Sequence, residues 1–254
     1  MLKAPRPPTA PSKPPLKAHI GVARTSGHAQ TSINTNIEWI IEMTDSPRSR
    51  ALLACGMALA PLFYATVVAQ MLTRTGFDIT KHPLSLLSLG NAGWIQVTNF
   101  LLTGVLAIAC AAGMRQRLRR SPGGTWGPLL IATFGLGMVI AGLAPPDPLL
   151  GFPPGAPAGI PAQMSGHAVF HGVGFFIAFL SLIAASFLFG RRFFLSGRPW
   201  WSVYSNATGV VTLLLIVAGM AIQSVTSLAF FVVGIIAFGW LGAIAAHLMV
   251  RSGE

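Results

Sequence analysis

Two histidines and one aspartate stand out in this sequence as residues whose types and spacing could do chemistry. His167 and His171 lie four residues apart at the start of a long apolar stretch, and Asp147 precedes them in a Pro/Gly-rich segment. On a helix, residues four apart share one face with Cβ atoms about 6 Å apart, so both imidazoles can face one divalent ion. Catalytic zinc needs a third protein ligand and an open water position, and Asp147 or His82 can supply that ligand. The pattern indicates His167, His171 and Asp147 as candidate zinc ligands, and Asp147, His171 and His82 as candidate catalytic residues.

The same residues allow two further interpretations. The histidines can hydrogen-bond to loop carbonyls and pin the Pro-rich segment over a helix bundle, or they can bind a ligand such as a lipid headgroup. Histidine pairs at this spacing also arise by chance, but polar side chains at membrane depth are costly, which favours a role. The candidate ligand-binding residues are Asp78, His82, Asp147, His167 and His171.

The composition places these residues in a membrane protein. Of the 254 residues, 53% are hydrophobic and only 9% are charged, whereas a soluble domain has about 25% charged residues. The net charge of +11 does not indicate nucleic-acid binding, because the basic residues lie in short segments between apolar stretches, as topogenic signals do. The two cysteines, Cys55 and Cys110, both lie within apolar stretches, so we expect free thiols.

Six stretches are long and apolar enough to cross a membrane as helices, for which about 20 residues suffice. Glycine and alanine are frequent inside them, which favours close helix packing. We therefore expect an all-α, six-helix membrane domain over residues 51–251. The predicted spans are Ala51 to Thr73, Ala92 to Met114, Trp126 to Ala144, His167 to Gly190, Val203 to Gln223 and Leu228 to Val250.

Residues 1–50 differ from the rest of the chain because they are rich in proline and basic residues. Such a segment cannot bury enough apolar surface to offset its ordering entropy, so we expect a disordered cytoplasmic tail. Met43 stands shortly before the first span, and translation starting there is an alternative to a dispensable tail. A short surface helix over Ile33 to Met43 is also consistent with the sequence.

The distribution of basic residues predicts the orientation. With both termini in the cytoplasm, 15 of the 17 Lys and Arg residues fall inside, and only Arg74 and Lys81 fall outside. By the positive-inside rule both termini are therefore cytoplasmic. Asp78, His82, Asp147, His167 and His171 then all gather at the outer face, and a short helix over Leu84 to Leu89 lies among them. No span carries a central Asp, Glu, Lys or Arg, which argues against ion-coupled transport.

Two polar residues of the second span, Gln96 and Asn99, share a helix face. We expect them to be hydrogen-bond partners between helices.

Several motifs resemble one known family. They are HPLSLLSLGNAGWIQVTNFLLTG, TWGPLL, AGLAPPDPLLGFPPG, HAVFH and RPWWSVYS, spread over Ala51 to Arg251. Together they resemble the bacterial six-helix membrane proteins of domain-of-unknown-function family 998. The resemblance implies a six-helix integral membrane protein and no particular activity. The family pattern commonly has an acidic residue after the second histidine, where this chain has Gly172. This departure either counts against a metal site or puts more weight on Asp147 and Asp78.

Three functional hypotheses follow for a protein of the bacterial cytoplasmic membrane. The first is a membrane protein of unassigned activity whose outer Asp/His cluster binds a ligand or pins the loop. The second is a metal-dependent hydrolase, with zinc as its cofactor, acting on a lipid or lipid-linked substrate. The third is a transporter of small solutes or lipids. A shared site requires Asp147 and His171 to lie within hydrogen-bonding or metal-sharing reach, with His82 nearby.

Overall fold

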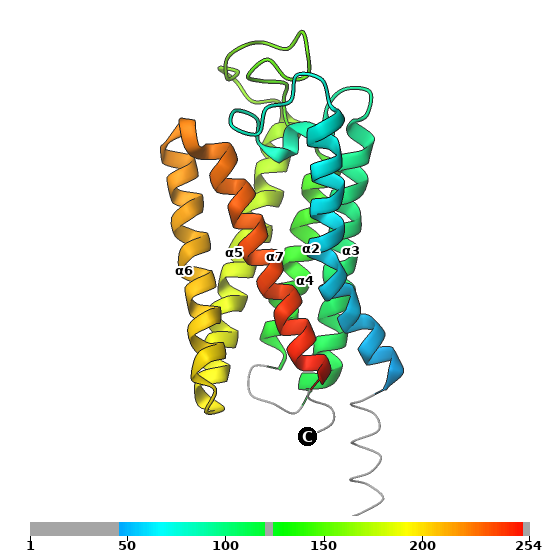
Figure 1. Ribbon diagram of the computed structural model, residues 1–254, viewed down its shortest axis with the longest axis vertical. Coiled ribbons are helices and arrows are strands. Elements are labelled where there is room, and N and C mark those ends of the chain that lie inside the picture. Colours follow the sequence, from blue (N-terminus) through cyan, green and yellow to red (C-terminus); the bar gives the residue numbers. More distant parts are fainter. Residues whose placement is uncertain (1–45, 120–123, 251–254) are drawn as a thin grey trace, which may run out of the picture. The chain divides into compact units, whose positions relative to one another are not determined.

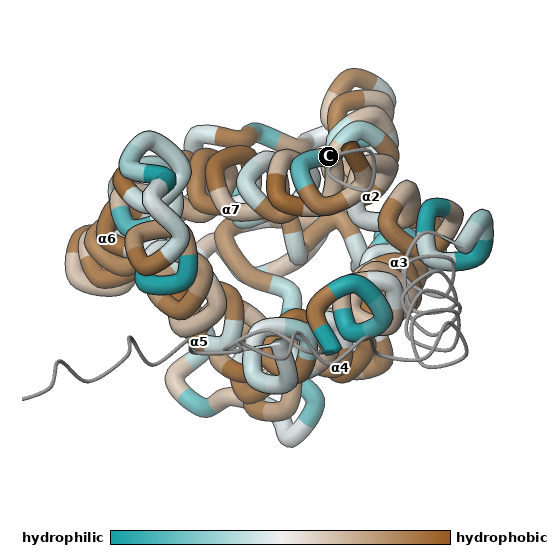
Figure 2. Tube along the Cα trace, turned by 90° about the horizontal axis from the view of Figure 1, so that it is seen from below, coloured by the Kyte–Doolittle hydropathy of each residue, from teal (hydrophilic) through white to brown (hydrophobic). Residues whose placement is uncertain are grey.

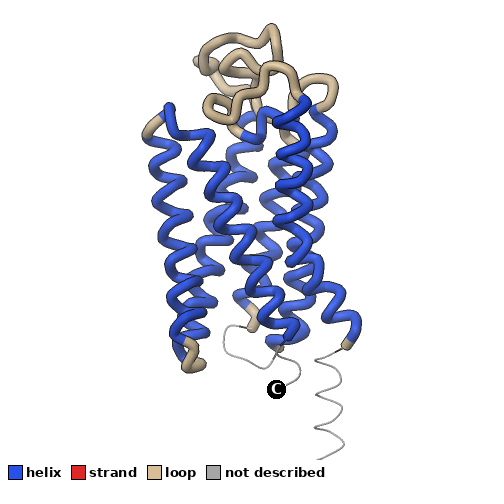
Figure 3. The backbone as a smooth tube through the Cα atoms, viewed as in Figure 1, coloured by secondary structure: helices blue, strands red, loops and turns tan. Residues whose placement is uncertain are grey.

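Six long helices form the part of the chain that the structure describes. This computed structural model describes residues 46–119 and 124–250, and within them it contains no strand (Figure 3). Each long helix is long and apolar enough to cross a membrane, which confirms the predicted all-α membrane bundle. The expected tail helix over residues 33–43 lies outside the described residues. The elements are α2 (Pro47–Thr73), η1 (Leu84–Ser88), α3 (Gly93–Leu118), α4 (Trp126–Leu143), α5 (Gly166–Leu195), α6 (Pro199–Ala221), η2 (Gln223–Val225) and α7 (Thr226–Val250).

The long helices are arranged as a ring. Each helix contacts the next one along the chain, and α7 returns to contact α2 (Figure 2). The segments 74–92 and 144–165 lie together at one end of the ring, which we call the loop end (Figure 1). The first residues of α2 and the last residues of α7 lie at the opposite end. All residues that the sequence singled out for chemistry therefore belong to the loop end.

Helix caps, and not the limits of the apolar stretches, set the helix ends. Helix α2 already begins at Pro47, because the Ser46 hydroxyl accepts a hydrogen bond from the Ser49 N–H at 3.2 Å and proline suits the first helical position. Helix α5 begins after Ser165, which caps it in the same way, and continues to Leu195. The expected spans, which started at Ala51 and ended at Gly190, were therefore too short at these ends.

Close contacts at glycine join neighbouring helices. A Cβ atom added at Gly104 of α3 would lie 2.5 Å from the carbonyl oxygen of Gly135 in α4. A Cβ atom at Gly174 of α5 would lie 2.6 Å from the backbone nitrogen of Ala141 in α4. The backbones can approach this closely only because side chains are absent, as expected for small residues in membrane bundles.

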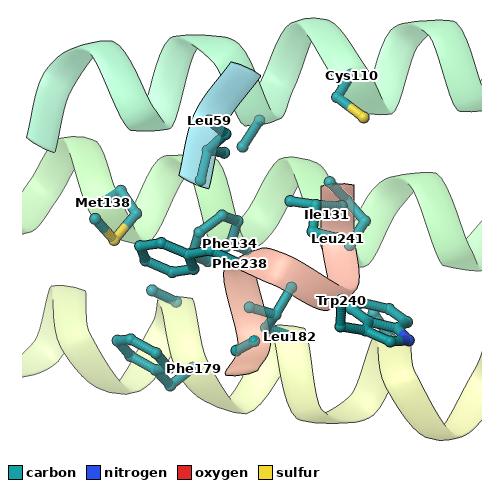
Figure 4. Packing of buried hydrophobic residues seen from close by; sticks show 14 of the residues in the cluster. Leu59, Cys110, Ile131, Phe134, Met138, Phe179, Leu182, Phe238, Trp240 and Leu241 are labelled. Carbon is teal, nitrogen blue, oxygen red and sulfur yellow. The ribbon is translucent and has the colours of Figure 1, made fainter. Parts of the chain in front are cut away.

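Large apolar side chains pack against one another inside the ring. Phe134 of α4 and Phe238 of α7 pack with ring centroids 5.4 Å apart, and Phe179 of α5 stacks on Phe238 at 6.1 Å (Figure 4). Trp240 is fully buried in the same cluster and donates its indole N–H to the Ser205 hydroxyl of α6 at 3.1 Å. Through these contacts α7 packs against α4, α5 and α6.

Polar contacts between helices agree with the sequence prediction. The Gln70 amide of α2 donates to the Gln96 Oε1 of α3 at 2.8 Å, and Asn99 donates to the carbonyl of Phe63 at 3.1 Å. Gln96 and Asn99 are both buried, so the expected role between helices is confirmed. Cys55 and Cys110 are free thiols, as expected.

Candidate functional site

His82 joins the two segments of the loop end. Its Nδ1 accepts a hydrogen bond from the Asp78 backbone N–H at 2.9 Å, so Nε2 carries the proton and donates to the Leu150 carbonyl at 3.0 Å. The ring is only 4% exposed and packs against Phe77 and Phe152, each with centroids 5.5 Å away. Both ring nitrogens therefore serve the backbone, and His82 pins segment 144–165 to segment 74–92.

Arg74 fixes η1 beneath these segments. Its guanidinium donates to the carbonyls of Leu87, at 3.0 Å, and of Leu89, and it lies 5.4 Å from the centroid of the Phe152 ring. These carbonyls belong to the end of η1, where no helical partner remains for them. The expected short helix is thus present over Leu84–Ser88, but with 3₁₀ geometry. Arg74 was predicted only as a basic residue on the outer side, and its contacts with η1 were not predicted.

Asp78 is occupied by its own turn. Its Oδ1 accepts from the Thr80 backbone N–H at 2.9 Å and from the Thr80 hydroxyl at 2.6 Å, and its Oδ2 lies 3.6 Å from the Lys81 ammonium. The hydrogen bonds from Thr80, helped by the charge of Lys81, hold the pKa of this carboxyl below its usual value. Asp78 therefore stabilises the turn that presents its backbone N–H to His82.

Asp147 performs a similar task at the start of α5. Its Oδ2 accepts from the Ser165 backbone N–H at 2.8 Å, and Ser165 in turn caps α5. Hydrogen bonding with Ser165 lowers the pKa of the Asp147 carboxyl, and the nearby His167 adds a smaller contribution. His167 itself is exposed. Asp147 also borders an open surface hollow of about 490 Å³ formed by the Pro-rich segment.

His171 ties α5 to the end of α4. Its Nδ1 lies 2.9 Å from the Ala141 carbonyl and 3.0 Å from the Ala144 carbonyl. Pro145 stands four residues after Ala141 and has no N–H to give, and Ala144 is the C-cap of α4, so its carbonyl has no helical partner. The imidazole N–H therefore supplies the donor that the proline-rich sequence cannot supply.

The five candidate residues thus do not form one cluster. Each of Asp78, His82, Asp147 and His171 has its own backbone partner, and no hydrogen bond joins Asp147 to His171 or His82 within residues 46–119 and 124–250. In the same residues no group of three His, Cys, Asp or Glu side chains could hold a metal ion. The donor set that a zinc centre requires is not assembled in this conformation.

One candidate, His171, lines a cavity in the centre of the ring. The cavity has a volume of about 290 Å³ and is bordered by all six long helices, with Pro83, Leu84 and Ser85 of the η1 region at the loop end. Its lining contains no charged residue. Seven phenylalanines line it: Phe63, Phe100, Phe175, Phe176, Phe179, Phe230 and Phe238.

The cavity reaches the outer surface of the bundle. Phe176 of α5 and Met220 of α6 both line it, and both are also exposed on the surface, by 41% and 60%. Phe175 of α5 and Phe230 of α7 meet beside them with centroids 5.0 Å apart. Since α5 and α6 are long and apolar enough to cross a membrane, this side of the bundle would border lipid in a bilayer.

Comparison with known proteins identifies the family. The sequence model of a family described as "Protein of unknown function (DUF998)" matches residues 57–247. No curated protein and no solved structure matches the chain. The match covers most of the chain and includes His82, Asp147 and His171, so the resemblance inferred from the motifs is confirmed. The chain is therefore an integral membrane protein by its six long apolar helices and a member of the DUF998 family, whose function is unknown.

Proposed function

We propose that this protein binds lipid, and that the aromatic cavity holds the apolar chain of a molecule taken from the surrounding leaflet. The observation that carries this proposal is the cavity itself, with seven phenylalanines, no charged residue, and a side that faces lipid. Ligand sites in proteins are typically concave and apolar with few polar groups, and in bundles they lie between helices.

The volume of the cavity suits part of a lipid. An apolar cavity of about 150 Å³ in another protein stays free of water and binds benzene. The present cavity, at about 290 Å³, is close to twice that size, so in proportion it holds an apolar group of roughly a dozen carbon atoms. Water would gain few hydrogen bonds there, whereas a lipid chain gains contacts with aromatic rings.

The candidate residues at the loop end have a supporting role in this proposal. His82, Asp78 and Asp147 hold the two loop segments over η1, and Arg74 fixes η1, which borders the cavity. This is the loop-pinning alternative drawn from the sequence. The asymmetry of basic residues supports a location in a bacterial cytoplasmic membrane with both termini inside, so the loop end faces outward and the ligand comes from the outer leaflet.

The other two hypotheses have no specific observation in their favour. A metal-dependent hydrolase would need His167, His171 and Asp147 to converge, but Asp147 contacts Ser165 and His171 contacts the end of α4. A transporter would need a polar path beyond His171, whereas the cavity lining is mostly apolar, with Ser85 and Tyr64 as its other polar side chains.

The test is photolabelling of the full-length protein in lipid vesicles with a lipid that carries a diazirine on its chain. We expect labels on peptides of α5 and α7 that line the cavity. Gly172→Leu should reduce this labelling at least tenfold, because Gly172 lines the cavity and a Cβ atom there meets open space. Gly239→Leu is the matched control, since its Cβ atom also meets open space but it does not line the cavity. Equal labelling of both variants and the wild type would refute lipid binding in the cavity.

A further inference from the structure

We infer that the bound lipid carries an uncharged hydroxyl group and that His171 Nε2 accepts a hydrogen bond from it. The ligand class is therefore a neutral lipid alcohol, such as a long-chain alcohol or an acylglycerol. This inference rests on the proposed lipid binding and specifies the polar end of the ligand.

The contacts of His171 with two carbonyls fix the tautomer of its imidazole. Carbonyl oxygens only accept hydrogen bonds, so the contacts of Nδ1 with Ala141 and Ala144 require the proton on Nδ1. In the neutral ring Nε2 then keeps a lone pair, because the bond made by one nitrogen sets the state of the other. No hydrogen bond to Nε2 is found among the described residues. The His171 imidazole, which lines the cavity, thus offers a hydrogen-bond acceptor and no donor at Nε2.

Tyr64 and Ser85 carry the other polar side chains of the cavity. The Tyr64 hydroxyl already donates to the Phe231 carbonyl at 2.8 Å, so it does not need a ligand. Ser85 lines the cavity at the loop end with a half-buried hydroxyl that can both donate and accept. A ligand hydroxyl can give its proton to His171 and accept one from Ser85, which a purely apolar chain cannot do.

The cavity offers no partner for a charged lipid head. A phosphate or carboxylate in this cavity would meet no Lys or Arg side chain in the lining, only the neutral imidazole of His171. The nearest basic residues in the loop segments are otherwise engaged, since Arg74 donates to η1 carbonyls and Lys81 lies beside Asp78. Burying an unpaired charge in an apolar site is far more costly than burying a hydrogen-bonded hydroxyl. The cavity therefore selects a neutral head.

A row of side chains on α5 indicates the orientation of the ligand in the cavity. His171, Phe175 and Phe179 follow one another at four-residue spacing on the same face of α5, over about 12 Å of helix axis. Phe175 and Phe179 pack with centroids 4.7 Å apart, and Phe179 continues to Phe238. A hydroxyl at His171 would thus lie near the loop end while its chain follows the phenylalanines inward, which is the usual orientation of a lipid.

Two substitutions of His171 separate its anchoring role from ligand recognition. In His171→Asn the amide nitrogen takes the place of Nδ1 and can still donate to the α4 carbonyls, but the Nε2 acceptor is lost. In His171→Gln the side chain is longer, and its amide oxygen can take the place of Nε2 while the Nδ1 donor is lost. Both variants are compared with the wild type by photolabelling with a diazirine-bearing long-chain alcohol and with its phosphate ester, alongside thermal unfolding in mild detergent.

For the wild type we expect the alcohol to label the cavity at least tenfold more than its phosphate ester. His171→Asn should lose about threefold to tenfold of the alcohol labelling, the range for one net hydrogen bond, with an unfolding midpoint close to wild type. His171→Gln should keep the preference for the alcohol but unfold at a lower temperature. If the histidine variants do not fold, Ser85→Ala, which removes only the second hydroxyl, should lower alcohol labelling about threefold.

Three outcomes would overturn the inference. Equal labelling by alcohol and phosphate ester, with the cavity still labelled, would refute the neutral head and leave lipid binding intact. Unchanged alcohol labelling in folded His171→Asn would show that the imidazole serves only as an anchor. Labelling that is insensitive to Gly172→Leu would mean that the cavity holds no lipid, and then the proposed function itself would be wrong.

Discussion

Replacing His82 with phenylalanine tests whether the loop end is held by two hydrogen bonds. Phenylalanine keeps an aromatic ring between Phe77 and Phe152 but leaves the Leu150 carbonyl and the Asp78 N–H without their partner. A buried polar group that loses its partner costs about 1–3 kcal/mol. The Asp78 N–H lies in a half-buried turn where water can replace the ring, so we expect a total of about 2–4 kcal/mol.

This cost should appear as local opening of segment 144–165. Leu150 and Gly151 donate their amides to the carbonyls of Gly159 and Pro157 at 3.2 and 2.9 Å, so hydrogen exchange of these two amides reports the opening. A change of 2 kcal/mol corresponds to roughly 30-fold faster exchange, at about 1.4 kcal/mol per factor of ten.

The control for this experiment is His167→Phe, the same substitution at an exposed position of the loop end. It should leave the exchange of Leu150 and Gly151 close to that of the wild type. If His82→Phe exchanges no faster than His167→Phe, then the hydrogen bonds of His82 do not hold the segment, and the reasoning that assigns the loop end a pinned structure is refuted.

Two further predictions concern Asp147 and Gly174. Because bonding with Ser165 lowers the folded pKa of Asp147, its stabilisation of the α5 start is complete above the ordinary carboxyl pKa of about 3.9 and is lost as pH falls through the lower folded value. Limited proteolysis of the loop at descending pH should show this loss in the wild type, and Asp147→Asn should not show it. Gly174→Ala should lower the unfolding midpoint, since its Cβ atom would lie 2.6 Å from a backbone nitrogen of α4 and overpacking typically costs about 1–3 kcal/mol. Gly172→Ala, whose Cβ atom meets open space, is the control, and equal midpoints would contradict the predicted backbone contact.

The sequence predicted the membrane spans well because their signal is local. About 20 apolar residues without charge are sufficient to identify a spanning helix, and all six appear in the structure. The helix ends are less predictable from apolarity, because α2 starts at its Ser46 cap and α5 runs through Arg191 and Arg192 to Leu195. Hydrogen bonds between backbone groups continue a helix where hydropathy has already fallen.

The candidate residues lie at one end of the bundle, but the partners of their side chains differ from those expected. Asp147 and His171 were expected to meet each other, whereas each contacts the backbone. Every residue carries a carbonyl and nearly every one an N–H, so a sequence does not distinguish the one that a side chain will choose. One signal was nevertheless present: Pro145 stands four residues after Ala141 and cannot donate a helical hydrogen bond to its carbonyl.

The cavity had no signal in the sequence at all. Its lining comes from η1 and six helices that are far apart in the chain, and its volume is what remains after their packing. The spacing of Phe175 and Phe179 is equally typical of a filled core. A cavity can be recognised only when the relative positions of all helices are known.

The two functions considered for His171, anchor and ligand group, require different atoms of the same ring. The anchor uses Nδ1, which meets the carbonyls of Ala141 and Ala144 at the end of α4, where helical donors are lacking. This bond offsets the cost of placing an imidazole in an apolar helix, and it also fixes the tautomer that leaves Nε2 as an acceptor. An apolar residue at this position would leave the carbonyls unpaired, and a longer amide would supply the acceptor without the donor. The carbonyls at the end of α4 therefore account for the Nδ1 donor, and the proposed ligand hydroxyl accounts for the Nε2 acceptor, which asparagine does not supply.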